Sequence, residues 1–253
     1  MNFFTYLVCL FLFVAPPINA RGCDVIRVGC AKNWYPVAFM LTPENTQATG
    51  VAVEIIKLAA KELGLKVTMD CSIPWKRLTM YMDTGEIDAI AGHYMTKQRQ
   101  RDWLVSKAII EDDILVIYKI NHQKITSIND LNDLHGLIGA IHRGANYGQK
   151  IDDFIKQQQA KNLIVETHLN DSIFSLIRYQ RVDYGFISKN DATEKIKRYG
   201  FVDEITLSKS IDVNTVHIAF SKHSACAVYF NQFNQLISQF KSTKVIDKLL
   251  TQY

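Results

Sequence analysis

Apolar and polar residues alternate over short segments in the first half of the chain, and stretches with helical spacing separate these segments. One such stretch places Val53, Ile56, Ala60 and Leu63 on a single helical face, as expected of a helix packed on a sheet. The predicted elements are a strand at 24–30, a helix at 53–63, a strand at 65–70, a helix at 77–84 and a strand at 87–91. This order predicts a parallel sheet with right-handed crossovers.

The same order of elements recurs in the second half of the chain, after a predicted strand at 113–119. The elements predicted here are a short helix opening at 128, strands at 137–141, 163–167, 182–187 and 216–220, helices at 147–159 and 171–181, and a terminal helix. No linker rich in Pro, Ser or Gly separates the two sets, which favours two lobes joined by ordered strands.

We therefore predict an α/β fold of two lobes, each a mostly parallel sheet flanked by helices. The predicted boundaries are 21–112 plus 210–253 for lobe 1 and 113–209 for lobe 2. Ligands of open α/β sheets bind at the carboxyl ends of the strands. Two lobes that face each other form a cleft there, so we expect a small-molecule site between them.

The N-terminus has the pattern of an export signal. Residues 1–20 carry no charged side chain, and an apolar run over 3–15 ends at Pro16 and Pro17. Thirteen residues are too few to span a bilayer as a helix, which needs about 20, but they suit a secretory signal peptide. We place cleavage after Ala20 and expect a soluble periplasmic product; a buried N-terminal helix is the alternative.

Composition narrows the class of protein. The chain of 253 residues is 48% hydrophobic and contains 13 Phe and 11 Tyr, enough to bury a core. Its net charge of +4 is spread along the sequence without a long basic block, so we expect no nucleic-acid partner. Motifs for nucleotide, zinc and serine-hydrolase sites are absent from the sequence, so we predict no cofactor and no metal.

Removal of Cys9 with the signal peptide leaves four cysteines, Cys23, Cys30, Cys71 and Cys226. An oxidising compartment permits two disulfides among them, with three possible connectivities. Cys30 and Cys71 each follow or end a predicted strand, so they could meet if those strands are neighbours. Buried free thiols are the alternative for each cysteine.

Candidate binding chemistry follows the strand at 87–91. Thr96 begins a turn that places Arg99 three residues later, and arginine is suited to bidentate capture of a carboxylate. Most arginines in such a short motif lie on the solvated surface. His93 also follows this strand, where ligand contact and a purely structural role are both open.

Several further motifs occur in a fixed order, namely Ile26-Arg-Val-Gly29, Gly85-Glu-Ile-Asp88-Ala, Gly92, Thr96-Lys-Gln-Arg99, Ser106, Gly144 and Arg181-Val-Asp183-Tyr-Gly-Phe186. With this set the mature chain resembles the family 3 periplasmic solute-binding proteins, the amino-acid-type receptors of ABC importers. The Pro74-Trp75-Lys-Arg77 element is similar to a divergent proteobacterial branch. The resemblance implies the two-lobed type II binding-protein fold, a monomer, a small-molecule ligand and an inner-membrane permease as partner.

The resemblance also implies residue roles. Arg99 matches the position that pairs with a ligand α-carboxylate, and the turn of Gly144, Ala145 and Asn146 matches backbone amides that bind the same group. Further matching positions are Gly92 and Tyr94 at the ligand ammonium and Trp34 over the ligand side chain; Trp75 and His93 complete the candidate set. Ordinary core packing is the alternative for Trp34 and Trp75.

One position departs from the family pattern. Ser188 stands where these receptors carry an Asp that holds the ligand ammonium, and Lys189 follows it. A neutral hydroxyl cannot make the same charge-assisted bond. We therefore expect a small carboxylate-bearing solute, an amino acid or an analogue. The acidic run at 111–113 near the predicted crossing between lobes is interpreted as solvated charge, with assistance to a cation as the alternative.

Two other functions remain open for this scaffold. Exported cyclohexadienyl dehydratases resemble the same family, and such an enzyme needs a general acid in the cleft. His93 and Glu111 are the candidates for that role. A sensor or scavenging module would bind ligand without a transporter.

Overall fold

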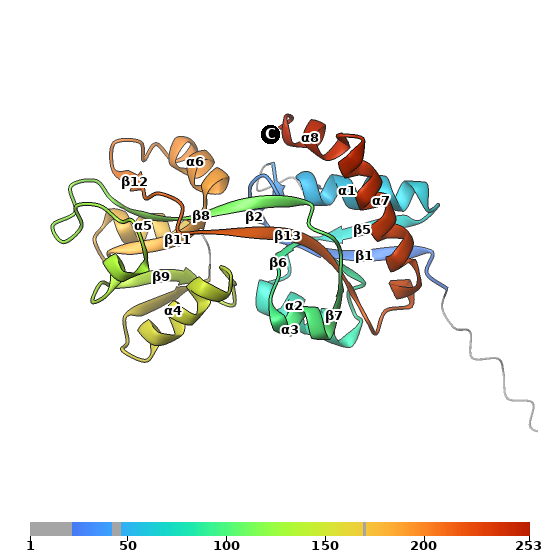
Figure 1. Ribbon diagram of the computed structural model, residues 1–253, viewed down its shortest axis with the longest axis horizontal. Coiled ribbons are helices and arrows are strands. Elements are labelled where there is room, and N and C mark those ends of the chain that lie inside the picture. Colours follow the sequence, from blue (N-terminus) through green and yellow to red (C-terminus); the bar gives the residue numbers. More distant parts are fainter. Residues whose placement is uncertain (1–21, 42–46, 169–170) are drawn as a thin grey trace, which may run out of the picture.

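The computed structural model describes residues 22–41, 47–168 and 171–253, and Figure 1 shows their arrangement. The predicted signal peptide, with its cleavage after Ala20, lies outside the described residues. Within the described part of the chain, no helix combines the length and apolar character needed to cross a membrane.

Lobe 1 is built on three parallel strands in the order β5-β1-β6. These are β1 (Val25–Cys30), β5 (Lys66–Asp70) and β6 (Ala89–Tyr94), which confirm the three strands predicted in this half. Helix α1 (Val51–Glu62) covers one face of this sheet together with α7 (Phe230–Ser242) and α8 (Val245–Leu250) (Figure 1). Helix α2 (Trp75–Thr84) covers the other face. All three strands therefore end at one edge of the lobe.

Lobe 2 repeats the arrangement with three parallel strands in the order β10-β9-β11. They are β9 (Gly139–His142), β10 (Ile164–Thr167) and β11 (Tyr184–Ser188). The helices of this lobe are α4 (Gln149–Gln159), α5 (Asp171–Arg178), α6 (Lys189–Arg198) and the short η1 (Leu131–Leu134). Both lobes thus have the predicted α/β class with a mostly parallel sheet.

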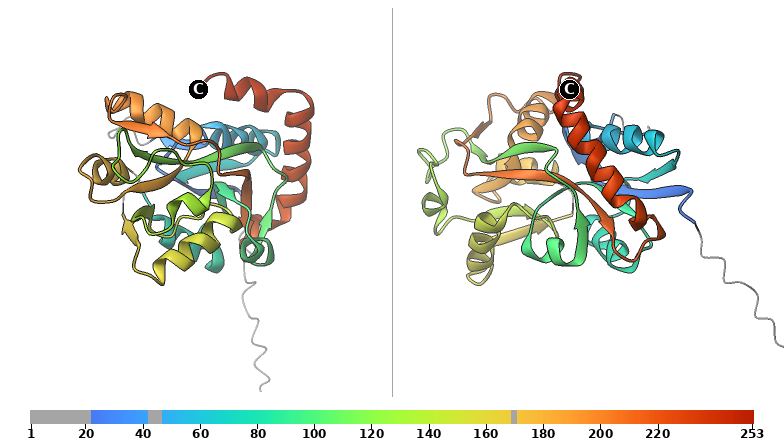
Figure 2. Two further views of the ribbon diagram at one scale, coloured as in Figure 1. Left: turned by 60° about the vertical axis from the view of Figure 1, so that its left-hand side comes forward. Right: turned by 45° about the vertical axis from the view of Figure 1, so that its right-hand side comes forward.

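Two long antiparallel strands join the lobes. Strand β8 (Ile110–Lys119) pairs with β13 (Asp212–Ser221), β8 continues along β11 in lobe 2, and β13 continues along β6 in lobe 1. Figures 1 and 2 show both strands running from one lobe into the other. The ordered connection is as expected, whereas the exact lobe boundaries at 112/113 and 209/210 stay predictions.

Several elements were not predicted. Helix α6 has a largely polar sequence whose buried residues include Asp191 and Lys195, so it lacks the apolar face used to identify helices. Strand β13 begins at Asp212, four residues before the predicted start at 216. Its first four residues are exposed or partly exposed and mostly polar, so the apolar pattern did not reveal them. The other additions are short: β2 (Asn33–Trp34), β3 (Ala38–Met40), β4 (Ala48–Thr49), α3 (Lys97–Asp102), β7 (Trp103–Val105), β12 (Ile205–Leu207) and η2 (Ala225–Tyr229).

Both disulfides form, and the strand arrangement explains one of them. Parallel pairing of β1 with β5 brings Cys30 beside Cys71 with their Cα atoms 4.6 Å apart, which confirms the conditional prediction. The second bridge joins Cys23, just before β1, to Cys226 in η2, with Cα atoms 4.9 Å apart. The four cysteines are therefore not free thiols.

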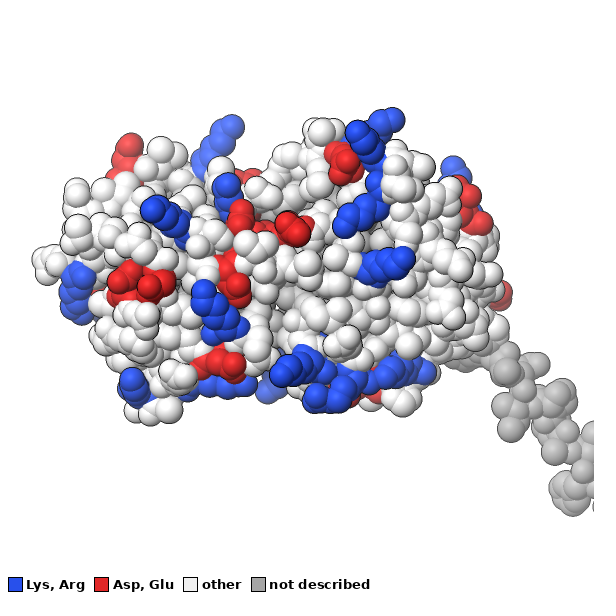
Figure 3. All heavy atoms as spheres, viewed as in Figure 1, with Lys and Arg blue, Asp and Glu red and all other residues white. Residues whose placement is uncertain are grey.

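Charge of both signs is dispersed over the surface. Figure 3 shows Lys and Arg side chains along the lower edge of one face, over α2 and α3, with acidic side chains among them. The exposed basic residues of these two helices are Lys76, Arg77, Lys97 and Arg101. The basic side chains behind the net charge of +4 are thus interspersed with acidic ones, as the sequence suggested.

Candidate ligand site

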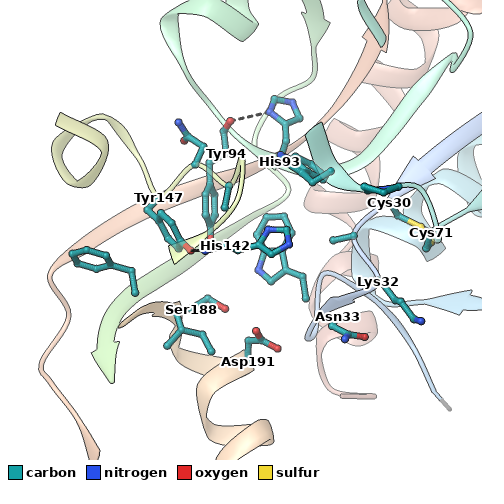
Figure 4. Close-up of a pocket in the computed structure, with 18 of the residues that line it drawn as sticks. Cys30, Lys32, Asn33, Cys71, His93, Tyr94, His142, Tyr147, Ser188 and Asp191 are labelled. Atoms are coloured by element: carbon teal, nitrogen blue, oxygen red, sulfur yellow. Dashed lines mark hydrogen bonds between the residues drawn. A yellow bond between two sulfur atoms is a disulfide. The ribbon is translucent and has the colours of Figure 1, made fainter. Parts of the chain in front are cut away.

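A cavity of about 270 Å³ lies where the two lobes face each other, at the carboxyl ends of β1, β5, β6, β9, β10 and β11. This is slightly below the range usual for ligand pockets, ~300–1,000 Å³. Eight of the ten predicted site residues line it, namely Trp34, Trp75, His93, Tyr94, Arg99, Ala145, Asn146 and Ser188. Figure 4 shows Tyr94 and His93 on one side of the cavity and Ser188 and Asp191 on another.

Arg99 brings an unneutralised cation to this cavity. Thr96 caps helix α3, because its Oγ1 accepts a hydrogen bond from Arg99 N at 3.1 Å, and this cap fixes the turn predicted from the sequence. The guanidinium donates from Nη1 to the Tyr94 carbonyl at 2.9 Å and lies 5.6 Å from the Trp75 ring and 5.4 Å from the Trp103 ring.

The Arg99 side chain forms no ion pair with any described residue. Burial lowers the pKa of Arg99 to about 10 although the charge of Asp152 opposes the shift, so the guanidinium remains charged at neutral pH. Two aromatic faces and one carbonyl hold it in place while leaving donors for a further partner. An anionic oxygen entering the cavity would supply that partner.

Tyr94 and Trp34 are tied to a buried carboxylate behind them. Tyr94 OH donates to Asp112 Oδ2 at 2.7 Å, and Trp34 Nε1 donates to the same oxygen at 3.2 Å. The two rings meet edge to face with centroids 4.9 Å apart. Asp112 is only 4% exposed, so its interpretation as solvated charge was wrong; β8 carries it inward between the lobes. Burial raises the pKa of Asp112 to about 6.

The two oxygens of Tyr94 differ in what they can still bind. The carbonyl already accepts from Arg99 and from His93 Nδ1. The hydroxyl donates to Asp112, and its oxygen keeps lone pairs that can accept a hydrogen bond from a ligand. Contact of this hydroxyl with a ligand ammonium stays a prediction, while the carbonyl orients the Arg99 guanidinium.

His93 is buried and neutral. Its Nδ1 donates to the Tyr94 carbonyl at 2.9 Å, and its ring packs edge-on against Trp103. Burial lowers the pKa of His93 to about 3, with a further contribution from the Arg99 charge. The second enzyme candidate, Glu111, is exposed on β8 and is not among the residues lining the cavity. His93 is therefore not a protonated acid at neutral pH, and Glu111 does not line the cavity.

Gly92 and Gly144 support the site without lining it. Gly92 has φ +91°, and a Cβ there would fall 2.5 Å from Val37 Cγ1 and 3.3 Å from Trp34 Cζ3, so only glycine lets the indole lie against β6. Gly144 has φ +76°, and its closest approach is to Lys76 of lobe 1, 3.4 Å from the position a Cβ would take. Gly92 therefore permits close packing beside the cavity, whereas Gly144 supplies a left-handed backbone conformation at the turn.

The turn before α4 uses several of its amides internally. Ala145 N donates to the His142 carbonyl at 3.0 Å, Tyr147 N donates to Asp152 Oδ1 at 2.9 Å, and Gly148 N donates to Asn146 Oδ1 at 3.1 Å. The sequence placed the start of this helix at 147, whereas α4 begins at Gln149. Of the three amides predicted to bind a carboxylate, only that of Ala145 is therefore engaged, and no described residue accepts a hydrogen bond from Gly144 N or Asn146 N. The carboxylate contact stays a prediction for those two amides.

The wall opposite Arg99 contains residues that the sequence did not identify. Asp191, in the first turn of α6, accepts from Lys195 Nζ at 2.8 Å and from Tyr35 N at 3.3 Å. Burial raises the pKa of Asp191 to about 6, although Lys195 opposes the shift. Lys195 Nζ also donates to the Asn33 carbonyl at 3.1 Å, so this pair contacts both lobes. Ser188, at the end of β11, lies near Asp112, but its buried Oγ meets no partner at hydrogen-bonding distance.

The remaining lining residues are mostly apolar or aromatic. His142, His168 and Ile187 lie at strand ends or directly after them, a position that the sequence could have indicated, whereas Ile117 and Ile173 lie inside β8 and α5 and carry no such signal. The principal ones are Ile117, His142, Tyr147, His168, Ile173, Phe186 and Ile187. Together with the tryptophans they make most of the cavity wall apolar.

Comparison with known proteins matches residues 26–253 to the family described as bacterial extracellular solute-binding proteins, family 3. Among curated proteins, the chain is 32% identical over 103 residues to the membrane-bound lytic murein transglycosylase F of Vibrio cholerae. That match covers 40% of this chain and 18% of the transglycosylase, so the chain corresponds to about a fifth of that relative's length.

Solved structures share the fold at low sequence identity. A histidine kinase sensor domain with similarity to periplasmic binding proteins superimposes with a TM-score of 0.78 at 16% identity, covering 90% of this chain and 95% of that domain. An ancestral arginine-binding protein bound to arginine gives a TM-score of 0.76 at 19% identity, covering 91% and 98%. These likenesses confirm the two-lobed type II fold. The chain belongs to family 3 of the bacterial extracellular solute-binding proteins.

Proposed function

We propose that the chain is a periplasmic solute-binding protein that captures a small carboxylate-bearing solute, an amino acid or an analogue, for an ABC importer. The observation that carries this proposal is the Arg99 guanidinium, which reaches the cavity between the lobes with no carboxylate partner among the described residues. A partly buried guanidinium without an ion pair gains free energy when an anion joins it. The ligand carboxylate is that anion in the proposal.

Ligand contact with both lobes supplies the mechanism. Arg99 belongs to lobe 1, and Ser188, Asp191 and Phe186 of lobe 2 face the same cavity. A solute held by Arg99 and enclosed by lobe 2 gains contacts only when the lobes are together, so it favours the closed form. The closed form is the species we propose for delivery to an inner-membrane permease, as a monomer.

The test is calorimetric titration with amino acids and small carboxylates, preselected by the thermal shift that a tight ligand produces. Arg99→Met removes the cation while keeping an apolar side chain, and we expect it to weaken carboxylate binding roughly 10- to 100-fold. Arg101→Gln is the matched control, since Arg101 lies in the same helix and is exposed. Equal affinities of wild type and Arg99→Met would contradict the carboxylate assignment.

The enzyme alternative finds little support in the site. His93 is neutral and bonded to Tyr94, and Glu111 is exposed outside the cavity. We propose binding without turnover, so purified protein should leave prephenate and arogenate unchanged. A sensor without a transporter would bind its ligand in the same way, and cross-linking in cells to a membrane permease distinguishes the two roles.

A further inference from the structure

The cavity has an imbalance of charge that bears on the class of solute. Arg99 contributes to its wall a cation that forms no ion pair with a described residue, although the charge of Asp152 acts on it from outside the lining. Among the described lining residues, Asp191 is the one carboxylate. Its Oδ2 accepts from Lys195 at 2.8 Å and its Oδ1 from Tyr35 N at 3.3 Å, so both oxygens are engaged by the protein itself. Asp191 and Lys195 therefore neutralise each other, and among the described lining residues the charges of Arg99 and of the exposed Lys32 remain.

The other carboxylates near the cavity are also directed at protein groups. Asp112 accepts from Tyr94 and Trp34 through Oδ2, behind those two rings. Asp152 accepts from the backbone of Tyr147 and from the side chain of Asn146. Neither Asp112 nor Asp152 is among the lining residues. A cationic group of a solute would meet no free carboxylate among the described residues of this wall.

The body of the solute would lie against apolar surface. Side chains from both lobes contribute hydrocarbon or aromatic rings, and the main contributors are Trp34, Ile73, Trp75, Ile117, Ile173, Phe186 and Ile187. An ammonium group placed here would lose its hydration without gaining an opposite charge, and it would share the cavity with the Arg99 guanidinium. An uncharged apolar body has neither cost and is stabilised by burial.

We infer that the solute is a carboxylic acid with an uncharged, apolar body, bound through its carboxylate to Arg99 and without an ammonium group. This inference rests on the proposed function and narrows it from amino acids and analogues to acids that lack the amino group. Neutral acceptors of the wall, such as the Ser188 hydroxyl, are left for a hydroxyl or a water.

The test compares pairs of compounds that differ only at the amino position. Calorimetry is run with 3-phenylpropionate against L-phenylalanine, and with 4-methylpentanoate against L-leucine. We expect the acid without the ammonium to bind roughly tenfold or more tightly in at least one pair, because its partner brings an unpaired charge. An amino acid that binds as tightly as its deaminated partner, or more tightly, in each pair that binds would overturn the inference.

A variant that supplies the missing acceptor provides the reverse test. Ser188→Asp places a carboxylate on the cavity wall, and we expect the affinity ratio within a pair to move at least about tenfold toward the amino acid. Ser188→Asn is the matched control and should leave the ratio near that of the wild type. An unchanged ratio in Ser188→Asp would count against the inference.

Arg99→Met separates this inference from the proposed function. If amino acids bind more tightly than the deaminated acids and Arg99→Met weakens the binding of both members of a pair, the proposed function stands and the inference fails. If binding of both members of a pair is indifferent to Arg99→Met, or neither pair binds, the proposed function fails and the inference fails with it.

Discussion

Asp112 links the aromatic wall of the cavity to the strand that joins the lobes. Its Oδ2 accepts from both Tyr94 and Trp34, and β8 supplies its backbone. Burial raises the pKa of Asp112 to about 6 from an ordinary value of 3.8, which means that the folded protein binds this proton more tightly than the unfolded chain does. The free energy of unfolding contributed by this group therefore falls as the pH rises from about 4 to about 6.

Asp112→Asn should remove this dependence on pH. The amide oxygen of Asn can accept the same two hydrogen bonds, but it carries no charge. Between pH 4 and pH 7 the stability of the wild type should decline relative to the variant by about 2–3 kcal/mol, measured by urea unfolding at each pH. Asp191 titrates in the same range and its charge helps to raise the pKa of Asp112, so the difference between the two proteins reports Asp112 together with this coupling.

Glu111→Gln is the matched control for this measurement, because Glu111 neighbours Asp112 on β8 and is exposed. Its difference from the wild type should not vary with pH over the same range. A constant difference between wild type and Asp112→Asn would show that the carboxylate is not held at a raised pKa.

The local motif of Thr96 and Arg99 after a predicted strand pointed to Arg99, since ligands of α/β folds bind at strand ends. Trp34 was indicated by the family resemblance, and neither source indicated Asp112 as a buried group or Asp191 as part of the cavity wall. The two aspartates become buried only through partners far away in the chain, such as Tyr35 for Asp191, 156 residues earlier. Local polarity indicated solvent exposure for Asp112, and tertiary contacts override that indication.

At the level of elements, helix α6 of lobe 2 is joined to strand β2 of lobe 1 by one buried cation. Lys195 is 3% exposed and donates to Asp191 Oδ2 and to the Asn33 carbonyl. Its Nζ also lies 3.3 Å from Asp171 Oδ1 at the start of α5. The lobes are thus held together by a polar contact beside the cavity and not only by the two joining strands.

Lys195→Met should loosen this contact and destabilise the protein. The variant leaves Asp191 buried without its cation, a change that typically costs about 3–5 kcal/mol of unfolding free energy. Urea unfolding measures the loss, and small-angle scattering of the unliganded protein should show a larger radius of gyration as the lobes separate. Lys197→Met, at an exposed position of the same helix, is the control and should alter neither quantity appreciably.

The double variant Lys195→Met, Asp191→Asn tests the reason for the loss. Without the aspartate charge, much of the lost stability should return, because an unpaired buried charge is the source of the cost. A double variant that is even less stable than Lys195→Met would mean that packing around the lysine stem, and not its charge, is what matters.

The elements themselves were predictable in proportion to their apolar pattern. The six parallel strands of the two lobes and the helices α1, α2, α4 and α5 have the periodicity of half-buried or buried segments, and their existence was predicted correctly. Helix α6 and the first residues of β13 are polar because they face the cavity, the other lobe or solvent, so periodicity alone does not identify them. The departures from pattern thus lie partly at the candidate site, where function and hydrophobic patterning differ.

At the level of the whole molecule, the two disulfides constrain different parts of the chain. Cys23–Cys226 ties the start of β1 to η2 across 203 residues of sequence and lies away from the cavity. Cys30–Cys71 spans 41 residues and both of its cysteines line the cavity. A cross-link lowers the entropy of the unfolded chain more when it closes a longer loop. The first bridge should therefore contribute mainly to stability, and the second also to the shape of the site.

Paired alanine variants should separate these roles. Cys23→Ala with Cys226→Ala should lower the unfolding free energy by about 2–5 kcal/mol and leave ligand affinity within about twofold. Cys30→Ala with Cys71→Ala should cost about 1–2 kcal/mol less, because its loop is shorter, yet weaken binding, because the ends of β1 and β5 that border the cavity are no longer joined. Chemical unfolding and calorimetry on the same samples measure both quantities. The opposite result would contradict this assignment. In that case ligand binding would weaken on loss of Cys23–Cys226 and stay unchanged on loss of Cys30–Cys71.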